Sequence, residues 1–221
     1  MSMSALAELQ SLCPVKGSVY NQTLAVAKKL DKPSVAKFMT QWYAFSSTVP
    51  EILCIAALKA SCEAERSNIV ANLYSELGLD ADGTSHPELL KDLIEQATGQ
   101  TPSRDLVTFE TQDFLARLKK MMLAGSSPYN AGVMLALEAV AFNILAVLKE
   151  ILEKGGSRAL TAHPYITIHE EVEASHIENT EQNIDLYKAQ IGEINRGYAD
   201  MLIKWQLFWN DAFTGLVAQD V

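Results

Sequence analysis

The sequence predicts an all-α fold, a single-domain helical bundle of about seven or eight helices over residues 1–221. Hydrophobic residues recur with helical spacing along nearly the whole chain, and alternating β-branched runs are missing. Gly and Pro gather in short stretches between these segments. The chain has 221 residues, 48% of them hydrophobic, which is enough to bury a full core. It has no internal repeat and no linker long enough to separate a second domain.

The expected helices lie between short segments rich in turn-forming residues. These segments read "DKPS", "GLDADGTS", "TGQTPS", "GSSPYN" and "GGSRALTAHP". In the second, Gly78 is a typical helix stop, and Ser85 with Glu88 forms the "SHPE" capping box that begins the next helix. We expect helices at residues 20–30, 33–60, 64–78, 86–98, 104–124, 129–154, 165–189 and 192–217.

Composition excludes several classes of function. A net charge of −9 would repel phosphates, so we expect no nucleic-acid partner. The most apolar stretch, "VMLALEAVAFNILAVL", is interrupted by Glu138 and Asn143, so we expect no membrane partner. No secretory signal is visible, and Cys13, Cys54 and Cys62 form no CxxC pair. A reduced, cytoplasmic location is therefore expected. Nucleotide-binding and serine-hydrolase motifs do not occur.

Glu138 is a carboxylate inside an otherwise apolar segment. The residues on both sides of it, "VMLAL" and "AVAF", are those of a central, buried helix. Burying an unpaired carboxylate is costly, so a cation must offset the charge. The sequence leaves a metal ion, a basic residue from another helix, or a protonated acid as alternatives.

Glu76 and His86 lie on either side of one interhelical segment. Glu76 is close to the expected end of its helix, where the helix dipole disfavours a carboxylate unless another group holds it. His86 is at the start of the next helix, where the dipole disfavours imidazolium and favours the neutral, metal-binding form. The alternative is that His86 is an ordinary surface residue.

The segment "HPYITIHEEVEASHIENTEQ" contains three further candidates. At about 100° per helical residue, His169, Glu173 and His176 lie within one narrow arc of a helix. They form either one wall of a metal site or part of a solvated acidic face. We expect the neighbouring Glu170 to belong to a solvated face. A mixture of carboxylate and imidazole ligands suits iron or manganese better than zinc. His163, which precedes Pro164, is left out of the site.

The order of these residues resembles that of the haem-oxygenase-like diiron oxidases and oxygenases, with the TenA/PqqC-like fold and a CADD-like branch. The resemblance is carried by "NLYSELG" followed by a His on the next helix, and by the His-x3-Glu-x2-His helix, and it extends from about Lys32 to the last helix. It implies seven metal ligands: Glu51, Glu76, His86, Glu138, His169, Glu173 and His176.

The resemblance also implies how these ligands are shared between two irons. Glu76, His86 and His176 would bind mainly one iron, His169 and Glu173 the other, and Glu138 would bridge them. Glu51, in "TVPEILCIAALK", best matches a further carboxylate on the helix before Glu76. Many family members have Asp where this chain has Glu173, and the longer side chain can still bind a metal.

The implied activity is that of a non-haem diiron oxygenase or oxidase. Two Fe(II) ions (or manganese) would use O2 to oxidise a small substrate, such as an amino acid in a biosynthetic pathway. The reaction would be N-oxygenation, C–C cleavage, or nitrile or alkene formation. A fatty-acid oxidase and a non-catalytic metal-binding or scaffold protein are the alternatives. A ferritin-like protein would need a second ExxH motif, which the chain lacks.

The sequence contains fewer signals that identify the substrate. We expect a small-molecule substrate, and the sequence is compatible with a homodimer. Arg104, Lys120 and Arg158 are candidates to pair with a substrate carboxylate, and nothing in the sequence selects among them. Aromatic residues are candidates to line an apolar pocket, although they more often form the core. They are Trp42, Tyr43, Phe45, Phe142, Trp205 and Trp209.

Overall fold

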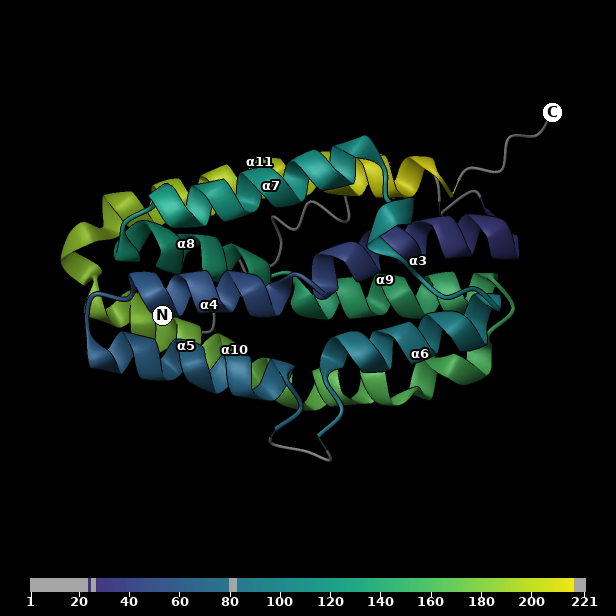
Figure 1. Ribbon diagram of the computed structural model, residues 1–221, viewed down its shortest axis with the longest axis horizontal. Coiled ribbons are helices and arrows are strands. Elements are labelled where there is room, and N and C mark those ends of the chain that lie inside the picture. The colour runs from purple at the N-terminus through teal and green to yellow at the C-terminus, as the bar shows by residue number, and fades with distance from the viewer. Residues whose placement is uncertain (1–23, 25–26, 80–82, 217–221) are drawn as a thin grey trace.

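The protein is a bundle of α-helices (Figure 1). The computed structural model describes Leu24 and residues 27–79 and 83–216, apart from the Phe142 side chain, and no strand occurs among them. This confirms the predicted all-α class. The α-helices are α3 (Lys32–Ser46), α4 (Val49–Lys59), α5 (Glu63–Glu76), α6 (His86–Thr98), α7 (Phe109–Ala124), α8 (Ser127–Glu138), α9 (Ala141–Lys154), α10 (Pro164–Leu186) and α11 (Ile191–Thr214). Short 3-10 helices are η2 (Arg104–Leu106), η3 (Arg158–Ala162) and η4 (Lys188–Gln190).

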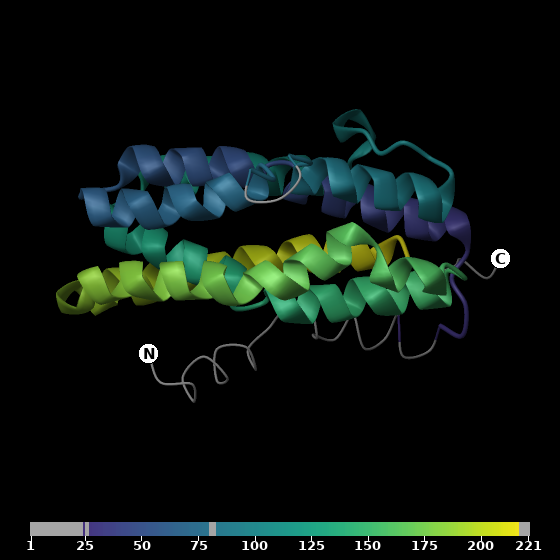
Figure 2. The same cartoon turned by 90° about the horizontal axis from the view of Figure 1, so that it is seen from below.

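Three pairs of shorter helices are arranged roughly end to end along the bundle. In Figures 1 and 2, α4 is followed lengthwise by α3, α5 by α6, and α8 by α9. The longer α10 and α11 extend alongside these pairs over much of the length of the bundle. The junctions of the pairs therefore come near the middle of the molecule, and the polar residues at helix ends are brought inside it.

The first junction divides a helix that we expected to be continuous over residues 33–60. The chain turns at Ser47 and Thr48 instead, and α4 begins at Val49 with Pro50 in its first turn. Proline lacks an N–H group, and its ring clashes with the carbonyl four residues earlier, here that of Ser46. The expectation of one helix was wrong because Pro50 was placed inside it.

The helix expected at 129–154 is also divided, into α8 and α9. The chain turns at Ala139 and Val140, directly after Glu138, the last residue of α8. No Pro or Gly occurs at this turn, so no local sequence signal marks it. Its consequence is that Glu138 stands at a helix end, where its carboxylate is directed to the middle of the bundle.

Two other expected helices differ at their beginnings. The helix expected at 20–30 falls largely outside the described residues, and residues 27–30 are not helical. The helix expected at 104–124 begins only at Phe109, after η2. Thr108 precedes it and accepts a hydrogen bond from the Thr111 N–H, which is the usual N-cap arrangement.

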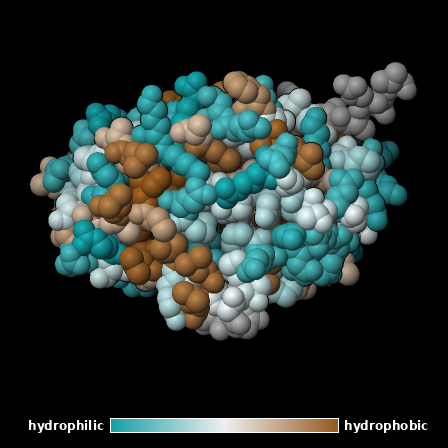
Figure 3. Space-filling view, in the orientation of Figure 1, coloured by the Kyte–Doolittle hydropathy of each residue, from teal (hydrophilic) through white to brown (hydrophobic). Residues whose placement is uncertain are grey.

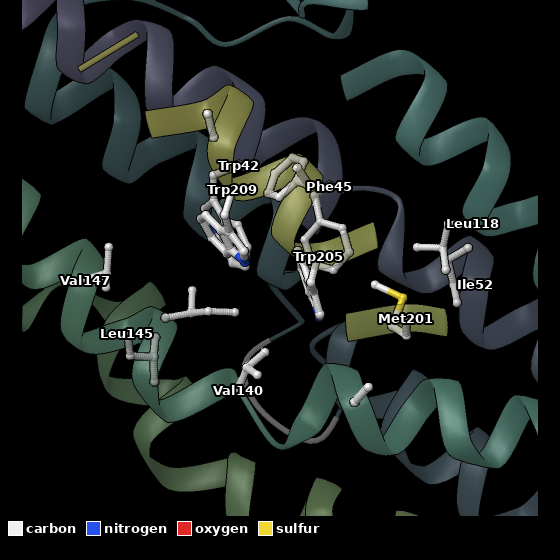
Figure 4. Packing of buried hydrophobic residues seen from close by; sticks show 14 of the residues in the cluster. Trp42, Phe45, Ile52, Leu118, Val140, Leu145, Val147, Met201, Trp205 and Trp209 are labelled. Carbon is white, nitrogen blue, oxygen red and sulfur yellow. The ribbon is translucent and has the colours of Figure 1, made fainter. Parts of the chain in front are cut away.

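The core next to the middle of the bundle is aromatic. Trp42 and Phe45 of α3 face Trp205 and Trp209 of α11 (Figure 4). The Trp42 and Trp209 rings stack at 5.4 Å between centroids, and Phe45 meets Trp205 edge-on at 4.6 Å. Such pairs stabilise a core beyond the area they bury, so these contacts fix α3 against α11.

The most apolar segment belongs to this core. Ser127–Lys154 is long and apolar enough to cross a membrane by length and composition, but 71% of its most apolar window is buried inside the fold. That degree of burial is typical of a core helix. On the face shown in Figure 3, hydrophobic side chains gather over the half that contains α4, α5 and α7. These helices carry the exposed residues Leu58, Val70 and Leu123.

Candidate metal centre

Four helices bring six of the seven predicted site residues together. Glu76 ends α5, His86 begins α6, Glu138 ends α8, and three residues come from the middle of α10. They form two groups, each of which offers three ligand atoms within 4.8 Å of one another. One group consists of Glu76, His86 and His169, and the other of Glu138, Glu173 and His176.

The first group is built around the junction of α5 and α6. His86 is completely buried, and its Nδ1 lies 3.3 Å from Oε2 of Glu76. The predicted capping box is present: Ser85 Oγ accepts from the Glu88 N–H, and the Glu88 carboxylate accepts from the Ser85 N–H. The cap fixes the first turn of α6, and thereby places the His86 ring opposite the end of α5.

Gly78 allows the chain to leave α5 close to this group. Its φ is +71°, in the left-handed region that favours glycine. A Cβ at this position would also lie 2.2 Å from the carbonyl oxygen of Thr84. Only glycine therefore fits the turn that separates Glu76 from His86, as the sequence indicated for the helix stop.

His169 is held in one tautomer by its own helix. Its Nδ1–H donates to the main-chain oxygen of Tyr165 at 2.6 Å, which leaves Nε2 as the available lone pair. The Tyr165 ring lies 4.3 Å from the His169 ring, and its hydroxyl accepts from Trp42 Nε1 at 3.0 Å. Burial lowers the pKa of His169 to about 4, so the ring is neutral. A neutral, oriented imidazole is the form that binds metal.

The second group lies between α8 and α10. The main partner of Glu138 outside the group is Asn72, whose Nδ2 lies 3.5 Å from Oε1 of Glu138 and 3.3 Å from the main-chain oxygen of His176. Asn72 was not singled out in the sequence, although it lies four residues before Glu76 and therefore on the same helix face. It is the buried amide that joins α5 to both α8 and α10.

The three carboxylates differ in their protonation behaviour. Burial, followed by the charge of Glu76, raises the pKa of Glu138 to about 8. Burial and the charges of Glu138 and Glu76 raise the pKa of Glu173 well above its usual range. Burial also acts to raise the pKa of Glu76, but the adjacent imidazoles, that of His86 above all, lower it overall. The six clustered residues together therefore carry more negative than positive charge.

Several atoms at the site are available to a metal ion. Among the described residues, no hydrogen-bond partner is present for the buried atoms Nε2 of His86 and Oε2 of Glu173. No salt bridge joins Glu76, Glu138 or Glu173 to a Lys or Arg in the described part of the chain. The basic-residue alternative for Glu138 is therefore not supported. Three carboxylates and three imidazoles are a donor set that fits iron or manganese.

Glu51 is placed apart from these six residues. Its side chain is 46% exposed, and its carboxylate pairs with Arg104 at 3.0 Å and with Lys119. These two cations lower its pKa, the hydrogen bond from Lys119 contributing most. The structure therefore does not support the expectation that Glu51 is a ligand, because its exposed carboxylate is paired with two cations and lies outside both groups.

The division of ligands between the two groups also differs from the expectation. His169 lies with Glu76 and His86, and His176 lies with Glu138 and Glu173, the reverse of the assignment that the resemblance implied. The reason is the antiparallel course of α5 and α10. His176 lies next to Asn72, one turn before the end of α5, whereas His169 is farther along, opposite the start of α6.

A cavity adjoins both groups. Its wall includes Glu76, Glu138, His169, Glu173 and His176, together with apolar and aromatic side chains. Of the expected aromatic residues, Trp42, Phe45 and Trp205 line it, and Tyr165 was missed. No Lys or Arg of the described chain lines this cavity. Arg104 binds Glu51 and Ser47, Lys120 is exposed, and Arg158 pairs with Glu153 at the surface.

The fold has close structural relatives. A CADD-like protein of unknown function from Nostoc punctiforme has 18% identity and a TM-score of 0.84, over 97% of this chain and 98% of that one. A domain of unknown function with a haem-oxygenase-like fold from Shewanella denitrificans has 13% identity and a TM-score of 0.69, over 96% of this chain and 90% of that one. A TenA homologue from Pseudomonas syringae has 13% identity and a TM-score of 0.68, over 96% of this chain and 90% of that one. These similarities confirm the predicted fold.

Comparison with curated proteins gives no match. Residues 36–199, however, match the family described as iron-containing redox enzymes. This range includes all six clustered residues and the whole cavity wall except for Trp205. On the extent of this match, the chain belongs to the iron-containing redox enzyme family.

Proposed function

We propose that the protein is an O2-dependent non-haem diiron oxidase or oxygenase that acts on a small, largely apolar substrate. The observation that carries the proposal is the meeting of three carboxylates and three imidazoles, in two groups, beside one aromatic cavity. Membership of an iron-containing redox family supports iron as the metal, and manganese shares the same ligand preference.

The proposed roles follow from the two groups. Glu76, His86 and His169 would hold one ion, and Glu138, Glu173 and His176 the other. Glu138 is the candidate to serve both ions, as the resemblance to the diiron oxidases implies, and the Asn72 amide lies against its carboxylate. Bound ferrous iron supplies electrons and open coordination positions for O2. The protein orients the ligands, as Tyr165 does for His169, and its aromatic wall keeps water from the reacting groups.

The cavity wall bears on the class of substrate. Because no Lys or Arg of the described residues lines it, a substrate carboxylate would be held by metal rather than by a basic side chain. The aromatic wall suits an aromatic or long apolar group. An amino acid with such a side chain meets both conditions, with N-oxygenation, C–C cleavage, or nitrile or alkene formation as the candidate reactions.

Anaerobic loading followed by exposure to O2 tests this proposal. Wild-type protein loaded with Fe(II) should bind about two irons per chain and consume O2 in the presence of ascorbate, with candidate substrates screened by mass spectrometry. Glu138→Ala should lose iron at both positions and stop O2 consumption. Glu170→Ala is the control, since Glu170 is on α10 but exposed and paired with Lys149.

Two results would contradict the proposal in different ways. Wild-type protein that holds two irons without consuming O2 with any substrate would be a metal-binding protein. Wild-type iron content in Glu138→Ala would show that Glu138 does not join the two ions.

A further inference from the structure

A line of polar side chains, all buried except for the half-buried Asn68, runs from the metal centre to the far end of α5 and α10. On α5 it consists of Glu65, Asn68 and Asn72, and on α10 of Thr180, Asn183 and, just after the helix, Tyr187. We call these six residues the polar seam. They recur at helical spacing on two facing antiparallel helices, where apolar residues would pack at lower cost. A buried polar line that ends at a reactive centre indicates a function.

The outer end of the polar seam meets solvent at Ser61. Glu65 is 2% exposed, and its carboxylate accepts hydrogen bonds from the Ser61 N–H at 2.7 Å and from the Tyr187 hydroxyl. The Ser61 hydroxyl, on an exposed residue, lies 2.6 Å from the Tyr187 hydroxyl. No salt bridge to Glu65 occurs in the described chain, and its neighbour Arg66 is directed to Glu63 and to main-chain oxygens. Hydroxyls therefore connect this buried acid to the surface.

The inner end of the polar seam meets the metal centre at Asn72. A second, narrow cavity lies between the two ends, and Glu65, Asn68, Asn72, Thr180 and Asn183 all line it. It has room for about one water molecule, and its polar wall offers that water several partners. Asn72 itself contacts Glu138. A water in this cavity is thus one residue away from the second metal group.

We propose that the polar seam is the path by which protons from solvent reach the metal centre, with Glu65 as its proton-carrying group. The inference rests on the proposed function, because reduction of O2 to water takes up one proton for each electron supplied by the reductant. The proton enters at Ser61 and Tyr187, passes through Glu65 and the cavity water, and ends on the water product. The second cavity shares Leu53 and Met134 in its wall with the cavity beside the metal groups, so the proton passes from water in one to water in the other alongside the Asn72 amide, which carries no proton itself.

Side-chain amide exchange tests whether the polar seam is wet, without any metal. In metal-free, 15N-labelled full-length protein, the Asn72 and Asn183 side-chain amides should exchange with water far faster than core main-chain amides. The exposed Asn195 sets the upper limit. Ala131→Leu, which fills the cavity wall, should slow the exchange of both at least about tenfold. Exchange as slow as that of the core in wild-type protein would overturn the proposal.

The rate of O2-dependent turnover tests Glu65. Glu65→Gln keeps the shape and hydrogen-bonding capacity of the side chain but removes the acid. It should slow turnover at least about fivefold and enlarge the solvent deuterium isotope effect, with iron content unchanged. Glu63→Gln is the matched control, because Glu63 is exposed and begins the same helix. Wild-type rate and isotope effect in Glu65→Gln would overturn the proposal.

A second variant and the exchange experiment keep the outcomes separate. If Glu65→Gln does not fold, Thr180→Val, which removes one hydroxyl from the cavity wall, should give the same slowing, and a wild-type rate would contradict the path. If wild-type protein consumes no O2, the proposed function fails, and the amide exchange in metal-free protein still decides whether the polar seam conducts water.

Discussion

At the scale of single residues, the chemistry of the centre depends on atoms outside the two ligand groups. The Tyr165 carbonyl sets the tautomer of His169, and the Ser85 cap sets the position of His86. Asn72 sets the orientation of Glu138. Such partners fix ligand geometry and metal affinity in metalloproteins generally. The two histidines of α10 accordingly serve different groups, and substitutions at them should have different consequences.

We expect His169→Ala to weaken the metal held with Glu76 and His86, and His176→Ala to weaken the metal held with Glu138 and Glu173. Each variant should retain about one iron per chain, because the other group keeps its three ligands. Their residual metal should differ in its absorption and magnetic spectra, since one group offers two imidazoles and the other offers one. Iron analysis and spectroscopy of the two variants make the comparison.

Two exposed carboxylates are controls for these variants. Glu170→Ala and Glu51→Gln should both keep wild-type iron content, because neither side chain reaches the centre. Loss of iron in Glu51→Gln would restore the ligand role that the sequence suggested. Identical spectra for the His169 and His176 variants would contradict the division into two groups.

The residues of the centre were largely predictable, and their partners were not. Glu138, in an apolar helix, and the His169–Glu173–His176 arc are visible as polar residues where a bundle should be dry. Glu51 was assigned from the family resemblance, which could not reveal that Arg104 and Lys119 lie beside it. The pairing of His169 and His176 depends on how α10 lies against α5 and α6, which helical periodicity does not determine.

At the scale of elements, the site is made by helix ends. Glu76, His86 and Glu138 each stand at the last or first residue of a helix, and of the four helices that carry the clustered residues only α10 passes the centre without a break. Gly78 and the "SHPE" cap mark two of these ends in the sequence, the end of α5 and the start of α6. The turn at Ala139 and Val140 has no such mark, so it must be imposed by tertiary packing.

The packing of α8 on α11 is one such constraint, and it makes a prediction. A Cβ on Gly197 would lie 2.0 Å from the carbonyl oxygen of Tyr129, and one on Gly132 would lie 2.0 Å from that of Ile194. Gly197→Ala should therefore destabilise the protein by at least about 1–3 kcal/mol, the usual cost of overpacking. Because α8 carries Glu138, iron content should fall as well. Denaturant unfolding and iron analysis measure the two effects.

Gly192→Ala is the matched control for this substitution. Gly192 lies on the same helix, and nothing lies within 4 Å of a Cβ built there. It should gain up to about 1 kcal/mol, because alanine favours helix over glycine. Equal stability changes at Gly192 and Gly197 would show that helix propensity, and not the close approach of α8 and α11, governs the Gly197 variant.

At the scale of the whole molecule, the negative charge of the carboxylates at the centre opposes folding when no metal is bound. The metal-free fold buries carboxylates that no basic residue of the described chain neutralises, and it does so in a protein whose net charge is already −9. Metal ions that bind only the folded chain restore this balance and add stability by mass action. The dependence of stability on pH should therefore differ between the metal-free and metal-loaded forms.

Between about pH 6.5 and 8 the metal-free protein should lose stability as the pH rises. The folded pKa of Glu138 is raised to about 8, above the ordinary 4.5, and that of Glu173 is raised as well, so the folded chain holds protons there that the unfolded chain has released. His169 acts below this window: its folded pKa of about 4 costs stability only as the pH falls below about 6.5.

A Mn(II)-loaded protein, with its carboxylates already ionised, should show no such decline in stability between about pH 6.5 and 8. Melting temperatures of both forms across this window measure the difference, and Glu138→Gln should flatten the metal-free curve. Parallel curves for the two forms would mean that metal does not bind at these carboxylates.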